Sequence, residues 1–203
     1  MKKIFSIVTL TFLLTIPITA QATTETYTVV TGDSLWKIAQ KYQVGLSEII
    51  AYNDQIKNPN LIYPNMKINI PEQEAGREFE KEVVRLVNVE RQKNGLSSLK
   101  ENWQLSRVAR YKSNDMKNKD YFSHTSPTYG SPFDMMKNFG IQYSYAGENI
   151  AKGQKTPQQV MNGWMNSSGH RANILSKNFT EIGVGYTVDQ NGTTYWTQMF
   201  IKP

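Results

Sequence analysis

The chain has 203 residues, no cysteine and two histidines, and its 23 basic residues exceed its 17 acidic residues. Without cysteine there are no disulfides, thiol nucleophiles or thiolate metal ligands, so the fold must be held by apolar packing alone. The mild positive charge suits an anionic cell wall or membrane surface. It is not the concentrated basic stripe of a nucleic-acid-binding protein, so we expect no nucleic acid partner.

The N-terminal segment has the three-part layout of a secretory signal peptide. Lys2 and Lys3 precede an uncharged, mostly apolar run, and Ala20-Gln21-Ala22 ends that run as a cleavage site. A membrane anchor is the alternative, but the run is short for a span and no basic residues follow it directly. We expect residues 1–22 to be removed, which leaves a secreted chain without a transmembrane span.

Residues 26–71 predict a small domain with the order strand, helix, helix, strand. The segment 26–30, "TYTVV", alternates as a strand does, and Asp33 or Ser34 can cap the helix that follows. Ser47 can cap a second short helix, and "KINIP" ends the domain as a strand stopped by proline. The first helix carries apolar residues at helical spacing, namely Leu35, Ile38, Ala39 and Tyr42.

The whole of this stretch, with its opening "YTVVTGDSLWKIA", resembles the LysM module. Modules of this family bind peptidoglycan or chitin, both N-acetylglucosamine glycans, in a groove between the loop after the first strand and the loop before the last. Backbone and small polar partners beside an apolar wall suit an acetamido sugar. Core packing is the alternative for Leu35, and the favoured one for Trp36. The resemblance implies that two runs line the groove: Gly32, Asp33, Ser34 and Leu35 on one side, and Asn60, Leu61, Ile62 and Tyr63 on the other.

Residues 72–78 are polar and lead directly into a helix, which predicts a short linker and two domains that lie close together. In the second domain, residues 79–203, Thr156 and Gln159 have the spacing of a capping box. Trp164, Trp196 and Phe200 are expected in its core. Four segments have helical patterns: 79–94, 102–116, 131–140 and 156–165.

The end of the chain predicts strands. Residues 181–188, "EIGVGYTV", alternate, and Asn191-Gly192 is a two-residue hairpin signal. The returning segment, "TTYWTQMF", is bulky on both faces, which predicts a central strand covered by helices on both sides. Several helices with a terminal antiparallel hairpin indicate an α+β sandwich.

Five motifs then occur in order: "YFSHTSP", "YAGENIA", "GWMNSSGHRANIL", "TEIGVGY" and "YWTQMF". Together they resemble the CAP superfamily, the SCP-like, pathogenesis-related and cysteine-rich secretory group, in a cysteine-free bacterial form. The resemblance covers residues 79–200. The predicted fold class is therefore α+β, a small βααβ LysM module followed by an α-β-α sandwich CAP domain.

In this family two histidines and one or two glutamates converge in a cleft, and some members bind a divalent metal there. The resemblance implies His124, Glu148 and His170 as catalytic candidates and also as ligands of an ion such as Zn²⁺; no other cofactor is expected. Many relatives carry a further glutamate where this chain has Ser167. Glu181 is our candidate to replace that acid.

The residues themselves leave alternatives open. His124 and His170 lie 46 positions apart, so no local ligand motif joins them, and each could instead cap a helix or hold a hydrogen bond. They are nevertheless the only imidazoles for proton transfer near neutral pH. Glu148 is expected on a loop, aimed into a cleft or fixing the loop itself. A serine nucleophile is disfavoured because no G-x-S-x-G motif is present.

Three functions compete. The favoured one is a wall-bound protein of a Gram-positive bacterium, held on peptidoglycan by LysM, whose CAP cleft binds a peptide, lipid or protein. The second is a peptidoglycan hydrolase or peptidase that uses the His/Glu cleft, with or without a metal. The third is a structural component of a spore or cell-wall assembly. The missing acid and the absence of a hydrolase motif favour binding.

Overall fold

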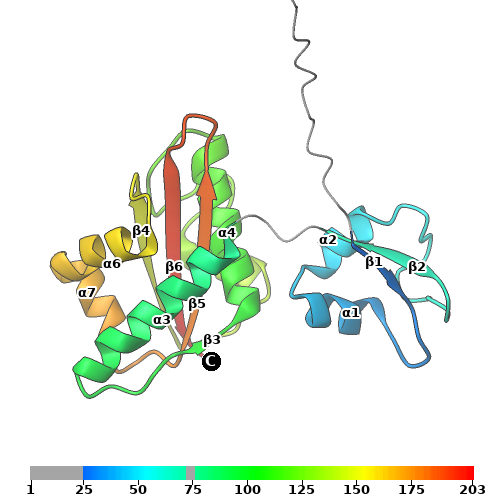
Figure 1. The fold of residues 1–203 in the computed structure, drawn as a ribbon, viewed down its shortest axis with the longest axis horizontal. Coiled ribbons are helices and arrows are strands. Elements are labelled where there is room, and N and C mark those ends of the chain that lie inside the picture. The colour runs from blue at the N-terminus through cyan, green and yellow to red at the C-terminus, as the bar shows by residue number, and fades with distance from the viewer. Residues whose placement is uncertain (1–24, 72–75) are drawn as a thin grey trace, which may run out of the picture.

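The computed structural model describes residues 25–71 and 76–203. The predicted signal peptide, 1–22, and residues 72–75 of the predicted linker lie outside them. The described chain forms a small and a larger α+β domain (Figure 1). Neither described stretch contains a helix with the length and apolarity needed to cross a bilayer.

The small domain has the predicted order of strand, helix, helix and strand. Its elements are β1 (Glu25–Thr28), α1 (Leu35–Tyr42), α2 (Leu46–Ala51) and β2 (Lys67–Ile70). The two strands pair antiparallel, with Tyr27 opposite Ile68. Both helices pack their apolar faces against this ribbon, and the core consists of Val29, Leu35, Ile38, Ala39, Val44, Ile49, Ile56, Ile68 and Ile70.

Helix caps in this domain explain one success and one error of prediction. Ser34 caps α1 as expected, because its side chain accepts a hydrogen bond from the Lys37 amide at 3.2 Å. The prediction of Ser47 as the cap of α2 is wrong. The cap is Gly45, whose amide donates to Glu48 Oε2 at 2.8 Å, so the helix begins earlier.

The large domain is an α-β-α sandwich. Its sheet has the strand order β3-β5-β6-β4, so β6 is central, as predicted, and β4 is an edge strand. Helices α3, α6 and α7 contribute to the core on one face, and α4 and α5 to the core on the other (Figure 1). The elements are α3 (Arg77–Lys93), β3 (Lys100–Glu101), α4 (Trp103–Asn118), α5 (Pro132–Asn138), β4 (Tyr145–Lys152), α6 (Pro157–Asn166), α7 (Ser168–Ile174), β5 (Glu181–Val188) and β6 (Thr194–Lys202).

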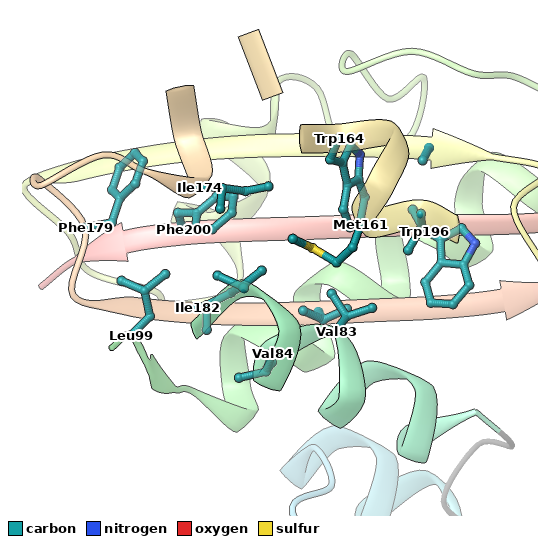
Figure 2. Packing of buried hydrophobic residues seen from close by; sticks show 14 residues of the cluster. Val83, Val84, Leu99, Met161, Trp164, Ile174, Phe179, Ile182, Trp196 and Phe200 are labelled. Carbon is teal, nitrogen blue, oxygen red and sulfur yellow. The ribbon is translucent and has the colours of Figure 1, made fainter. Parts of the chain in front are cut away.

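Aromatic side chains fill the core under α3 and α6. Figure 2 shows Met161 of α6 over the central strand, between Phe200 and Trp196, and Trp164 of the same helix beside the edge strand β4. Trp164, Trp196 and Phe200 are almost fully buried, which confirms their predicted place in the core. The indole N–H of Trp164 also donates to the Ile150 carbonyl of the edge strand at 3.2 Å.

On the opposite face, α4 lies directly on the backbone of β5. A Cβ added to Gly183 would stand 2.3 Å from the backbone of Leu105 and Ser106, and one added to Gly185 would stand 2.2 Å from that of Ala109. Only glycine permits this approach. The helix also supplies a hydrogen bond to the strand, since Ser106 Oγ accepts from the Val184 amide at 3.1 Å.

Several predicted boundaries are wrong. Helix α3 begins at Arg77, inside the predicted linker 72–78. The Asn191-Gly192 signal predicted a two-residue turn, but the β5–β6 connection spans residues 189–193. The side chain of Asp189 organises this longer loop by accepting from the amides of Asn191 and Thr193 at 2.8 and 2.7 Å. The predicted capping box at Thr156 is incomplete, because Gln159 accepts from the Lys155 amide instead.

Candidate functional site

A histidine–carboxylate pair lies at the edge of the sheet in the large domain. Glu148 Oε1 lies 2.7 Å from His124 Nδ1; the side chain of Glu148 is 2 % exposed and that of His124 is 54 % exposed. A buried carboxylate that holds Nδ1 fixes the orientation of the ring and leaves Nε2 as the nitrogen outside the pair. The prediction that Glu148 sits on a loop is wrong, since it lies near the middle of β4, opposite Met199 of β6.

A buried lysine holds the loop that carries His124. Lys112 of α4 is fully buried, and its ammonium donates to the carbonyls of Ser123 and His124 at 2.7 and 2.8 Å and to the Tyr121 hydroxyl at 3.2 Å. Burial lowers the pKa of Lys112, while the charge of Glu148 opposes this. The lysine therefore positions the backbone of His124 and places a positive charge near Glu148.

Asp115, one turn further along α4, fixes the rest of the same loop. It accepts hydrogen bonds from the hydroxyls of Tyr121, Ser126 and Thr128 at 2.5–2.6 Å. Burial raises the pKa of Asp115, but these hydrogen bonds outweigh it, so that the pKa lies below its usual value. Ser126 is buried and its hydroxyl is committed to Asp115, which argues against its use as a nucleophile.

His170 reaches the site on a short helix that the sequence did not predict. Residues Ser168–Ile174 form this helix, α7. Asn149 Nδ2 donates to the His170 carbonyl at 3.1 Å, and Asn173 Nδ2 donates to Asn149 Oδ1 at 2.8 Å and to the Glu148 carbonyl at 3.2 Å. These side-chain amides bind α7 to β4 beside the His124–Glu148 pair.

The two histidines are close enough to influence one another. Burial, and secondly the charge of His124, lowers the pKa of His170 below 6.5. Near neutral pH the imidazole of His170 is therefore uncharged. The resemblance implied that His124, Glu148 and His170 lie together. Of these, His124 and Glu148 are in direct contact, and the backbone of His170 is bound to Asn149, the residue after Glu148.

Glu181 lies elsewhere. It starts β5, which is separated from β4 by the central strand β6, and its Oε2 accepts from Asn102 Nδ2 at 2.6 Å. Because Asn102 is the N-cap of α4, this contact serves the start of that helix. Ser167, which stands near the position of the family's further glutamate, is the N-cap of α7.

The donor set does not match the expected metal site. Among the residues that the structure describes, no three His, Asp or Glu side chains are grouped so as to hold a metal ion. Glu148 is engaged with His124, and its other oxygen is buried without a hydrogen-bond partner. Since Zn²⁺ sites use three or four protein ligands, we assign Glu148 to the orientation of His124.

We expect the low pKa of His170 to appear directly in a titration. His124→Ala removes one of its two causes, so the pKa of His170 should rise toward 6.5 while burial still keeps it below that value. The measurement is NMR of the imidazole protons against pH, with His170→Ala as the assignment control. A His170 pKa of 6.5 in the parent protein would contradict this geometry.

The low pKa of His170 also makes the free energy of unfolding depend on pH. The pKa of His170 is lower in the native state than in the unfolded chain, so the unfolded chain binds the proton more readily. The contribution of His170 to the free energy of unfolding is present above pH 6.5 and is lost as the pH falls through the native pKa.

In the small domain, residues 32–35, the first of the two predicted glycan-binding runs, are engaged in the fold itself. Leu35 is 2 % exposed and belongs to the core. Asp33 accepts from the Tyr27 hydroxyl at 2.8 Å and from the Val30 amide at 2.9 Å, while Ser34 caps α1. Gly32 has a φ of 91°, which the turn after β1 requires.

The second predicted run, residues 60–63, is more exposed to solvent. Leu61 and Tyr63 are 50 % and 56 % exposed, Asn60 is exposed, and Ile62 packs partly against the core. Backbone hydrogen bonds join this loop to the end of β1, because the Asn65 amide donates to the Val29 carbonyl at 2.8 Å and the Met66 carbonyl accepts from the Val29 amide at 2.9 Å. The two runs therefore belong to neighbouring loops.

The core placement favoured for Trp36 is wrong, since this side chain is 43 % exposed. Sequence reasoning also missed Lys112, Asp115 and Asn149. Lys112 carried a usable signal: it lies four residues after Val108 and four before Met116, on the apolar face of the predicted helix. A lysine in that register indicates a buried ammonium with specific partners.

Comparison with known proteins agrees with this architecture. Residues 84–200 match the model of the cysteine-rich secretory protein family, CAP, and residues 27–71 match the LysM domain. YkwD of Bacillus subtilis is 64 % identical over 123 residues, which are 61 % of this chain and 47 % of YkwD. SpoIVD-associated factor A of the same organism is 58 % identical over 40 residues, 20 % of this chain and 10 % of that protein.

A solved structure is similar as well. The crystal structure of an extracellular SCP-domain protein from Bacillus anthracis has 32 % sequence identity and a TM-score of 0.59, over 69 % of this chain and 47 % of that one. The chain thus spans about half or less of the length of these relatives. With a family model that covers more than half of its residues, the chain belongs to the CAP family of cysteine-rich secretory proteins and carries an N-terminal LysM domain.

Proposed function

We propose that the protein is secreted and is held at the cell wall of a Gram-positive bacterium by its LysM domain, which binds peptidoglycan or a related N-acetylglucosamine glycan. The CAP domain then presents the His124/Glu148 cleft to a peptide, lipid or protein ligand. The LysM match supports the glycan class. The extracellular SCP-domain protein that shares the fold supports the location.

The observation that carries the proposal is the half-exposed pair Leu61 and Tyr63. Large apolar side chains on a turn-rich loop gain free energy when a ligand covers them, and the apolar face of a pyranose ring has a suitable size. Val30, 55 % exposed, lies on the neighbouring loop that follows β1. Together these exposed side chains offer apolar surface on the two loops.

Sedimentation with purified peptidoglycan tests the LysM assignment. Tyr63→Ala and Leu61→Ala should each reduce the affinity about tenfold, because buried aromatic and aliphatic anchors dominate binding energy. The matched control is Tyr145→Ala, which removes a tyrosine of similar exposure, 52 %, from the CAP domain. If both LysM variants sediment as the parent does, the glycan is held elsewhere.

A second candidate function is hydrolysis of wall peptide or glycan in the CAP cleft. The observation that favours it is the carboxylate–imidazole pair, since a ring oriented through Nδ1 can act as a general base toward water through Nε2. His170, uncharged near neutral pH, would be a second proton acceptor. We rank binding first, because Ser126 is committed to Asp115 and no hydrolase motif accompanies the pair.

A structural role in a spore envelope is the third candidate. It is favoured by the 58 % identity over 40 residues to SpoIVD-associated factor A. A fluorescent fusion followed through sporulation distinguishes the two locations. Signal around the forespore supports this role, whereas signal confined to the wall of growing cells contradicts it.

A further inference from the structure

A groove of about 380 Å³ lies between the two domains, where α1 of the LysM domain faces the start of α4. Both domains contribute to its walls. Its principal lining residues are Trp36, Gln40, Lys100, Glu101, Trp103 and Gln104.

The domains are held together beside this groove by specific contacts. Arg107 of α4 donates to Glu48 of α2 at 2.6 Å, and the Tyr111 hydroxyl donates to the same carboxylate at 2.9 Å. The Arg107 side chain also occupies the space where a Cβ of Gly45 would stand. The groove is therefore formed by domains that are joined through charged and polar side chains.

Two tryptophans form the apolar part of the groove. The rings of Trp36 and Trp103 have centroids 6.5 Å apart and planes inclined by 44°. Trp36 remains 43 % exposed in spite of this contact. Trp103 is partly exposed as well, so both indoles leave apolar surface open to a ligand that enters between the domains.

The remaining walls are polar and retain unused hydrogen-bonding capacity. Within the described part of the chain, the side-chain amides of Gln40 and Gln104 form no hydrogen bond, and neither do the charged groups of Lys100 and Glu101. Glu181 also borders the groove, so one lysine faces two carboxylates. The local charge disfavours an acidic ligand.

Indole faces combined with free amides match the chemistry of a sugar, whose C–H faces pack on aromatic rings while its hydroxyl and acetamido groups hydrogen-bond. Trp36 follows directly after Leu35, at the end of the run predicted to border the LysM glycan site. We propose that this groove is a second glycan subsite, which binds a neutral N-acetylhexosamine strand that extends from the LysM domain onto the CAP domain.

This subsite rests on the proposed glycan binding and adds a length dependence to it. A short oligosaccharide occupies the LysM loops alone. A longer strand also reaches Trp103, and the second contact is made at high effective concentration because both sites lie on one chain. Affinity therefore increases with strand length more than for the LysM module alone.

Calorimetric titration of the two-domain chain, residues 23–203, with the trimer and the hexamer of N-acetylglucosamine tests the proposal. Trp103→Ala should weaken hexamer binding about tenfold and leave trimer binding unchanged. Gln104→Ala leaves both tryptophans unchanged and removes one side-chain amide, so it should weaken hexamer binding about threefold. Phe133→Ala removes an aromatic side chain of similar exposure, 44 %, outside the groove and should change neither affinity.

The outcomes separate this subsite from the function on which it rests. Hexamer affinity that is unchanged in both Trp103→Ala and Gln104→Ala overturns the subsite but leaves LysM binding intact. An equal loss for trimer and hexamer also overturns it, because the damage then lies in the LysM loops. If the parent binds neither oligomer, the proposed glycan binding itself is wrong.

Discussion

Gly185→Ala is expected to destabilise the CAP domain by about 3 kcal/mol or more, although it adds a single methyl group. That methyl would stand 2.2 Å from the backbone of Ala109 and Arg110, so neither a rotamer change nor a flexible neighbour can relieve the clash. Helix α4 would have to lift from β5. Urea denaturation followed by circular dichroism measures the change in the free energy of unfolding.

Gly163→Ala is the matched control. Gly163 lies inside α6, and nothing stands within 4 Å of the position of its Cβ. Alanine is the better helix former, so this variant should be about 0.5–1 kcal/mol more stable than the parent. Equal small effects of the two substitutions would mean that α4 does not rest on the strand as described.

Lys112→Met is the second substitution for which we expect a large loss, about 2–4 kcal/mol. Methionine fills similar space, but it removes the buried ammonium that donates to the carbonyls of Ser123 and His124. The loop should loosen, and His124 should lose its fixed position against Glu148. Urea denaturation gives the stability, and the imidazole NMR signals report on the loop.

Lys117→Met provides the comparison for this variant. Lys117 lies on the same helix but is partly exposed, and its ammonium donates to the Thr187 hydroxyl at 3.2 Å. A change within about 0.5 kcal/mol is expected there. If Lys112→Met is as mild as Lys117→Met and leaves the His124 signals unchanged, the lysine does not position the loop.

Local patterns predicted the parts of the fold whose causes are local. Apolar spacing and the Ser34 side chain were sufficient for α1. The alternation in β5 and the bulk of β6 predicted the hairpin and the central strand. In each case the deciding residues lie within one element or its direct neighbour.

Parts that depend on distant partners were missed. Strand β4 contains Gly147 and Asn149, which disfavour strands, and it is extended because it pairs along its length with β6. Helix α7 is too short to be stable alone and is fastened by Asn149 and Asn173. The candidate site therefore has its glutamate on a strand, where a loop was expected, and one histidine on a helix that was not predicted.

The exposure of individual side chains to solvent was also hard to predict from the sequence. Helical spacing indicates which residues share a face, but the surface that covers the face is set by the tertiary fold. Trp36 was expected in the LysM core and instead faces Trp103 of the other domain. Glu181 was proposed for the His/Glu cleft, yet it lies beside this contact between the domains.

We propose that the protein binds the cell wall and does not cut it. Purified peptidoglycan is incubated with residues 23–203 and with a His124→Ala/His170→Ala double variant, with Zn²⁺ or with a chelator. The pellet reports binding, and mass spectrometry of the supernatant reports cleavage. We predict that both proteins sediment equally and release no fragments. Fragments released by the parent but not by the double variant would contradict the account and identify a hydrolase that uses these histidines.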